Sequence, residues 1–308
     1  MLIKYGFGIA ITVPQPTPLI TLLDVRDQRR PDIVEESAFI TTPDVPQSMY
    51  RDQFGNMCRR MIAPAGEFAI TMGGTIRDSG APDLVDRTLC EVPVAELPDD
   101  VLVYLLGSRY CETDRLSDVA WAQFGGVQPG WARVEAIVDF VHRRISFDYL
   151  QARDTRTAAE AYEEGVGVCR DFAHLTIALC RALNIPARYV NGYLGDIGVP
   201  KDPAPMDFSA WCEIYLGGQW CAFDARHNKP RIGRVPVAYG RDATDVPLIH
   251  SFGQHVLKSF KIWTDEVVSE TSGRWPLSSL ELMRSRSLAP RWIGGSSPQT
   301  PLPRNSGT

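Results

Sequence analysis

Gly165-Val166-Gly167-Val168-Cys169-Arg170-Asp171-Phe172-Ala173-His174 is the most informative segment of this 308-residue chain. Its two glycines predict a turn that leads directly into a helix, and Asn184-Ile185-Pro186 ends that helix. Residues at offsets of 3, 4, 7, 11 and 14 from Cys169 share one side of the predicted helix, which therefore faces a core; they are Phe172, Ala173, Thr176, Cys180 and Leu183.

Cys169 stands in the first turn of this helix and has two interpretations. A thiol at a helix N-terminus lies at the positive end of the helix dipole, which favours the thiolate and hence a nucleophile. The alternative is a small buried side chain, because free cysteines are among the most buried residues. Arg170 and Asp171 are expected to position the first turn.

The rest of the chain alternates between strand and helix patterns. Residues 1–95 contain short alternating runs separated by Pro, Asp and Gly, which predict an N-terminal β-sandwich-like domain. Helical patterns fill residues 97–184 and strands return from 186 to about 265, so residues 96–268 form a second domain of α+β class. Residues 269–308 are a Pro-, Ser- and Gly-rich tail, whose last part is expected to be disordered.

Composition restricts the function classes. The chain is 44% hydrophobic and 22% charged with a net charge of −5, as expected for a soluble globular protein, and it has no basic patch for nucleic acid. No apolar run approaches the length of a transmembrane helix, and the N-terminus lacks the features of a signal peptide. The seven cysteines are dispersed without CxxC or CxxH pairs, which argues against disulfides and zinc. We therefore expect a cytoplasmic protein with no metal, organic cofactor or membrane partner.

A second informative segment is a predicted hairpin. Gly217-Gly218 separates two strand runs, and a two-residue turn there places Tyr215 opposite Trp220. Alternation then puts Ser209 and Asp224 on one face as diagonal neighbours. An imidazole at position 209 would reach both Asp224 and a thiol packed above the sheet, which is the arrangement of a Cys-His-Asp relay.

Taken together, three segments resemble the bacterial transglutaminase-like cysteine-enzyme family, which has a papain-like core. Residues 167–174 resemble its nucleophile segment, and residues 220–228 resemble its aspartate segment. Asp207-Phe208-Ser209-Ala210-Trp211-Cys212-Glu213 resembles its histidine segment, usually Asp-Phe-His-Ala-Trp-x-Glu. The resemblance covers residues 1–265 and implies a β domain followed by a core with helices packed on an antiparallel sheet.

The family pattern implies that Cys169 is the nucleophile, Asp224 the orienting acid, and residue 209 a histidine. This chain has Ser209, whose hydroxyl is not basic enough to take a thiol proton at neutral pH. His227 is a candidate substitute base, although a loop histidine bound to backbone or water is the alternative. His174 lies about 140° around the helix from Cys169 and is expected in the core.

Several other side chains have open roles. Trp211 is a candidate substrate-binding residue, with packing against Trp220 as the alternative. Arg226 lies opposite Ser209 in the predicted register and could occupy the space of the missing histidine. Glu213 is expected to pair with an arginine, and Cys212 and Cys221 to lie in the core.

The resemblance therefore implies an enzyme that attacks a peptide, protein or amide substrate and forms a thioester on Cys169. Hydrolysis of that thioester gives a protease or amidase, whereas capture by an amine gives a transglutaminase, and the sequence does not choose between them. Because of Ser209, the alternative is a catalytically degenerate scaffold that binds a peptide or protein. The oligomeric state is left open.

Overall fold

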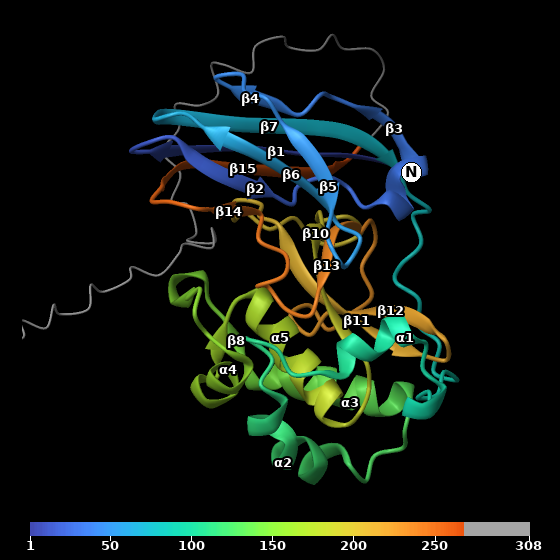
Figure 1. Cartoon of the computed structure of the whole chain (residues 1–308). Helices are drawn as coiled ribbons and strands as arrows, with labels where there is room; N and C mark the ends of the chain where they lie inside the picture. The colour runs from blue at the N-terminus through green and yellow to red at the C-terminus, as the bar shows by residue number, and fades with distance from the viewer. Residues whose placement is uncertain (268–308) are drawn as a thin grey trace, which may run out of the picture.

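The computed structural model describes residues 1–267, and the predicted tail at 269–308 lies outside the described residues. Figure 1 shows a layered β part above and a helical part below, joined through the strands labelled β10 and β13. The fold is α+β, with antiparallel sheets at the N-terminus and helices packed on an antiparallel sheet in the second part, as the sequence predicts.

The β part consists of two stacked sheets. One has the strand order β15-β1-β7-β3, with β4 also paired to β7, and the other has the order β14-β2-β6-β5. The N-terminal strands are β1 (Leu2–Val13), β2 (Thr17–Thr21), β3 (Ile33–Glu36), β4 (Ile40–Thr42), β5 (Ser48–Arg51), β6 (Met57–Ala63) and β7 (Gly66–Arg77). The strands added from the end of the described chain are β14 (Ile249–Ser251) and β15 (Val256–Glu266).

β15 changes the domain organisation expected from the sequence. It pairs antiparallel with β1 along almost its whole length, with Ile3 opposite Glu266 and Ile9 opposite Phe260. The predicted boundaries assigned residues 249–266 to the second domain, because pairing between strands so far apart in the chain leaves no local signal. β1 itself follows the predicted alternation, and its inward side chains Ile3, Tyr5 and Phe7 are completely buried.

The helical part is built around one central helix. Its helices are α1 (Asp99–Leu102), α2 (Thr113–Phe124), α3 (Trp131–Arg144), α4 (Ala158–Glu164) and α5 (Cys169–Ala182). Its strands are β8 (Ser146–Phe147), β9 (Val166–Gly167), β10 (Ala187–Tyr193), β11 (Ser209–Leu216), β12 (Gln219–Phe223) and β13 (Val235–Gly240). Short 3-10 helices cover Asp27–Asp32, Val94–Glu96, Val103–Leu105 and Tyr149–Gln151.

α5 packs on β10 and β11 with one side and is covered by α2, α3 and α4 on the others. Every residue from 170 to 181 is buried, so the helix is central rather than facing the core with a single stripe. In the sequence, polar residues of this helix separate the apolar ones, but in the structure these polar side chains are also buried and form hydrogen bonds. Arg181, for example, donates to the backbone oxygen of Ala187 at 2.9 Å.

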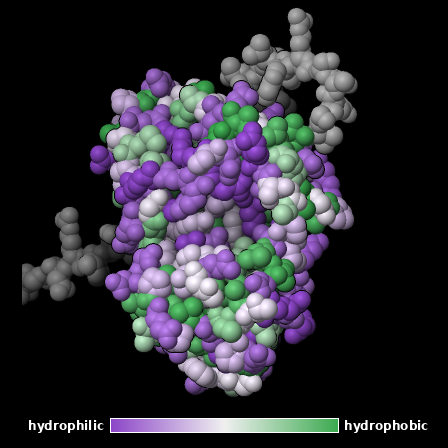
Figure 2. All heavy atoms as spheres, turned by 90° about the vertical axis from the view of Figure 1, so that its right-hand side faces the viewer, coloured by the Kyte–Doolittle hydropathy of each residue, from purple (hydrophilic) through white to green (hydrophobic). Residues whose placement is uncertain are grey.

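The surface between the two parts is hydrophilic on one face. Figure 2 shows hydrophilic side chains around a hollow at the junction of the β part and the helical part. Within residues 1–267, none of the helices has both the length and the apolar character needed to cross a membrane.

Candidate active site

The loop before α5 fixes the position of Cys169. α4 ends at Gly165, which has a left-handed φ of 67°, and β9 then pairs in parallel with β8, with Phe147 opposite Gly167. The Asp171 carboxylate accepts a hydrogen bond from the Val168 backbone N–H at 2.9 Å and so caps the helix. A Cβ on residue 167 would lie 2.7 Å from the Asp171 carboxylate, so the cap requires glycine there.

Cys169 is partly exposed, and the backbone of Ala210, the second residue of β11, acts to lower the pKa of its thiol. Burial of the sulfur raises the pKa of Cys169 to about 11, although the Arg226 charge acts in the opposite direction. Burial therefore acts against the thiolate, in the opposite direction to the effect expected of the helix N-terminus. Cys169 is a neutral thiol at neutral pH and needs a base to become a nucleophile.

The predicted hairpin is present with the predicted register. Tyr215 pairs with Trp220 and Glu213 with Ala222, and the turn glycines Gly217 and Gly218 have φ values of 56° and 87°. Ser209 is the first residue of β11 and is 8% exposed. Because the Ala210 backbone acts on the Cys169 thiol, Ser209, at the family's histidine position, directly precedes a residue close to that thiol.

Asp224 follows β12 and is 7% exposed. Its carboxylate lies 2.9 Å from His227 Nδ1 and 3.2 Å from an Arg234 guanidinium nitrogen. Burial alone would raise the pKa of Asp224, but the His227 hydrogen bond and the Arg234 charge hold it well below its usual value. Asp224 therefore orients a histidine, and this histidine is His227.

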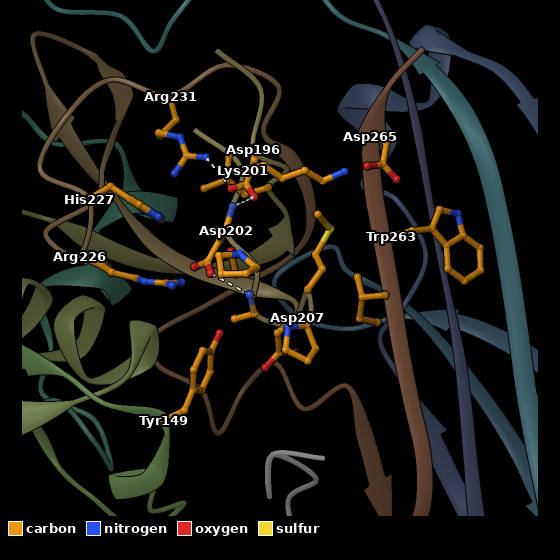
Figure 3. Close-up of a pocket in the computed structure, with 17 residues that line it drawn as sticks. Tyr149, Asp196, Lys201, Asp202, Asp207, Arg226, His227, Arg231, Trp263 and Asp265 are labelled. Atoms are coloured by element: carbon orange, nitrogen blue, oxygen red, sulfur yellow. Dashed lines mark hydrogen bonds and ion pairs between the residues drawn. The ribbon is translucent and has the colours of Figure 1, made fainter. Parts of the chain in front are cut away.

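A cavity of about 620 Å³ opens beside these residues, and both Ser209 and His227 line it. Figure 3 shows Arg226 and His227 reaching into it from one side, Tyr149 from below, and Trp263 and Asp265 across from them. Cys169 is not among the residues that line this cavity, but the charges of two lining residues, Arg226 and Asp207, act on its thiol.

Trp211 does not reach the cavity. It is 1% exposed and packs with Val190 and Tyr239, and Arg234 lies over its ring at 4.8 Å. The structure thus places this candidate substrate-binding residue in the core, because its side chain projects from β11 toward β10 and β13. Glu213 pairs with Arg188, with 2.8 Å between Arg188 Nε and the Glu213 carboxylate, as predicted.

The other histidine near Cys169 is structural. His174 is completely buried, stacks on Tyr110 with 5.2 Å between ring centroids, and accepts a hydrogen bond from the Ala243 backbone N–H at 3.1 Å. Burial lowers the pKa of His174 far below that of a free histidine, so its imidazole is neutral. This agrees with the predicted core position.

Sequence reasoning assigned no role to two residues of the cavity wall. Burial raises the pKa of the Asp207 carboxyl to about 7, so this group titrates near neutral pH. The pKa of Tyr149 rises to about 12, mainly through burial. Asp207 lies two positions before Ser209, so strand alternation could have placed it on the same face; Tyr149 has no such signal. Residues 1–267 contain no group of three or more His, Cys, Asp or Glu side chains that could hold a metal ion.

Comparison with known proteins identifies the family of this chain. The profile of the Transglutaminase-like superfamily matches residues 118–225. The crystal structure of a candidate cysteine protease from Cytophaga hutchinsonii is 31% identical, with a TM-score of 0.75 over 90% of this chain and 94% of that one.

Two mycobacterial relatives share shorter regions. An uncharacterized protein of Mycobacterium leprae is 37% identical over 111 residues, which are 33% of this chain and 38% of that protein. One of Mycobacterium tuberculosis is 30% identical over 148 residues, which are 44% of this chain and 46% of that protein. The chain therefore matches less than half the length of either relative.

Proposed function

The chain belongs to the transglutaminase-like superfamily, and from this premise we propose that it is a thiol enzyme acting on acyl groups through a thioester on Cys169. The observation that carries the proposal is the His227–Asp224 hydrogen bond of 2.9 Å, on the wall of the cavity that Ser209 also lines. A neutral His227 that donates from Nδ1 to Asp224 keeps a lone pair on Nε2 and can accept a proton.

Ser209 serves as a relay in this proposal. Its hydroxyl can accept one hydrogen bond and donate another, so a proton can pass from Cys169 through Ser209 toward His227. A thiol with a pKa of about 11 is ionised to only about one part in 10⁴ at pH 7, so the base is essential. General-base catalysis supplies about 10²- to 10⁴-fold in rate.

The second half of the reaction restricts the substrate. An amide leaves only when its nitrogen is protonated, and in this proposal that proton must return from His227 through the Ser209 hydroxyl, a less direct path than from a histidine at position 209. A thioester or activated ester needs less assistance, because its leaving group is stable as an anion. We therefore propose a preference for such acyl donors over peptides and amides, with water or an amine resolving the Cys169 thioester. The dispersed and unpaired cysteines support a cytoplasmic location.

The second candidate function is a scaffold that binds a peptide or protein without turnover. Ser209 and the raised pKa of Cys169 favour it. Hydrolysis of an S-phenyl thioester by the natural protein, by Cys169→Ala and by Cys90→Ala separates the two. The enzyme predicts turnover that Cys169→Ala abolishes and Cys90→Ala retains, because Cys90 is an exposed thiol outside the cavity. Turnover indistinguishable from the uncatalysed rate in all three proteins would establish the scaffold.

A further inference from the structure

We propose that Arg226 forms a carboxylate-binding subsite, so that the cavity selects acyl donors that carry a carboxylate group. The acyl-donor part of this inference rests on the proposed function, whereas the binding of a carboxylate does not. Arg226 is held by aromatic stacking, its N–H groups form no hydrogen bond or ion pair within residues 1–267, and its charge acts on Cys169.

Arg226 is fixed by stacking. Its guanidinium carbon lies 3.9 Å from the centre of the Phe147 ring and 6.0 Å from that of Tyr149. Phe147 is itself anchored, because it pairs with Gly167 in the loop that delivers Cys169. Stacking uses the face of a guanidinium and leaves its in-plane N–H donors free, in the fork geometry that matches a carboxylate.

These donors have no acceptor in the protein. Among residues 1–267, no side chain or backbone oxygen forms a hydrogen bond or an ion pair with Arg226. Two other arginines nearby differ: Arg231 donates to Gly195 O at 2.8 Å, and Arg234 donates to Asp83 at 2.9 Å. Figure 3 shows Arg226 pointing into the cavity without such an interaction. A half-buried guanidinium with free donors is prepared for an anion from outside.

Four aspartates line the cavity, and Figure 3 shows Asp202 on the side of Arg226; none of them forms an ion pair with Arg226. They are Asp196, Asp202, Asp207 and Asp265. Asp207 lines the same cavity, and it feels the Arg226 charge without forming an ion pair within 4.0 Å. Because burial raises the pKa of Asp207 to about 7, much of this carboxyl is neutral at physiological pH. Its protonated form can donate a hydrogen bond to the ligand instead of repelling it.

The proposed subsite is also close enough to Cys169 for the Arg226 charge to act on the thiol. Arg226 acts electrostatically on the Cys169 thiol, so a bound carboxylate would hold its acyl chain near the nucleophile. The cavity volume of about 620 Å³ suits a small substrate. A serine at position 209 is smaller than a histidine and so leaves more space in the cavity. Arg226, the proposed carboxylate-binding residue, lines the same cavity.

The kinetic experiment uses two matched donors, the S-phenyl monothioester of adipic acid and the methyl ester of the same compound. We expect the natural protein to prefer the free acid about 10- to 100-fold in kcat/KM, the range for a charge-assisted hydrogen-bonded pair. Arg226→Gln should bring that ratio to about 1. Lys201→Gln, which removes another cation of the same cavity, should retain it.

A binding experiment on Cys169→Ala is independent of turnover. Calorimetric titration should give adipate an affinity at least about 10-fold above that of adipamide, and Arg226→Gln in the same background should remove the difference. Competition by acetyl-glutamate amide against acetyl-alanine then separates a side-chain carboxylate from a C-terminal one.

The outcomes are distinguishable. Adipate binding that depends on Arg226 in a protein without turnover supports the subsite and refutes the proposed enzyme. Turnover with equal rates for the acid and the ester, unchanged in ratio by Arg226→Gln, overturns the subsite and leaves the enzyme standing. Equal slowing of both donors in Arg226→Gln also overturns it, because Arg226 would then assist Cys169 regardless of substrate.

Discussion

His227 Nδ1 lies 2.9 Å from the carboxylate of Asp224, and the two residues are three positions apart in the chain. The turn that brings them together is closed by the Asn228 backbone N–H, which donates to Asp224 O at 2.7 Å. Asn228 has a positive φ of 49°, a conformation that asparagine tolerates better than most residues, and its side chain donates to Asp139. The segment after β12 thus rebuilds a histidine–aspartate pair without a histidine at position 209.

If His227 is the base, His227→Asn lowers kcat for thioester hydrolysis by about 10²- to 10⁴-fold. The asparagine preserves a hydrogen-bond donor for Asp224 but cannot accept the proton. Steady-state kinetics check this, and His250→Asn is the matched control, because His250 is exposed on β14 away from the cavity. A His227→Asn variant as active as the His250→Asn control would remove His227 from the mechanism.

Ser209→His tests how far the serine lowers the rate of hydrolysis. A histidine there supplies the acid that an amide leaving group needs, so hydrolysis of an amide substrate should rise by about 10²-fold or more. Thioester hydrolysis should change less, since that leaving group needs little assistance. Parallel assays with an amide and a thioester of the same acyl group give the two ratios. A larger gain for the thioester than for the amide would contradict the proposed preference.

The elements that carry local signals could be predicted from the sequence, and those that depend on distant partners could not. The helix predicted at Cys169 is present as α5, and Gly217-Gly218 forms the expected turn. The pairing of β15 with β1 escaped prediction, because alternation identifies a strand without naming its neighbour.

In the candidate site, too, features with a local signal could be predicted, and features that depend on distant residues could not. Three segments identified Cys169 and Asp224, and proximity in the chain suggested His227. The raised pKa of Cys169 could not be foreseen, because a helix N-terminus is visible in the sequence whereas desolvation depends on the whole surrounding structure. The role of Arg226 depends on the Phe147 ring, which is far away in the sequence.

Asp207→Asn should stabilise the protein in a pH-dependent manner. The folded pKa of Asp207, about 7, lies above the unfolded value near 3.9, so the folded state binds more protons between these values and loses stability as the pH rises. The amide removes this penalty. We expect a gain in Tm of a few degrees at pH 8 and almost none at pH 4, measured by thermal unfolding. Equal gains at both pH values would refute the assignment.

Alkylation of Cys169 should be slow at neutral pH. With a pKa of about 11, the thiolate fraction at pH 7 is about 10²-fold below that of a free cysteine. In a Cys90→Ala background, which removes the exposed thiol, the iodoacetamide rate at Cys169 should rise about tenfold per pH unit from 7 to 10. Peptide mapping by mass spectrometry identifies the site. A plateau near pH 8 would contradict the burial effect.

Gly167→Ala should damage stability and activity together. The added methyl group would meet the Asp171 Cβ and carboxylate at 2.7 Å, and Asp171 cannot move freely, because it caps α5 and pairs with Arg156 at 3.2 Å. Overpacking and a weakened cap each cost about 1–2 kcal/mol, which should lower the free energy of unfolding measured in urea. Gly126→Ala is the matched control, since nothing lies within 4 Å of its added methyl group. Because Gly167 also sets the approach to Cys169, thioester turnover under conditions where the variant is folded should fall as well. A Gly167→Ala protein as stable and active as Gly126→Ala would show that the loop can deliver Cys169 without this close contact.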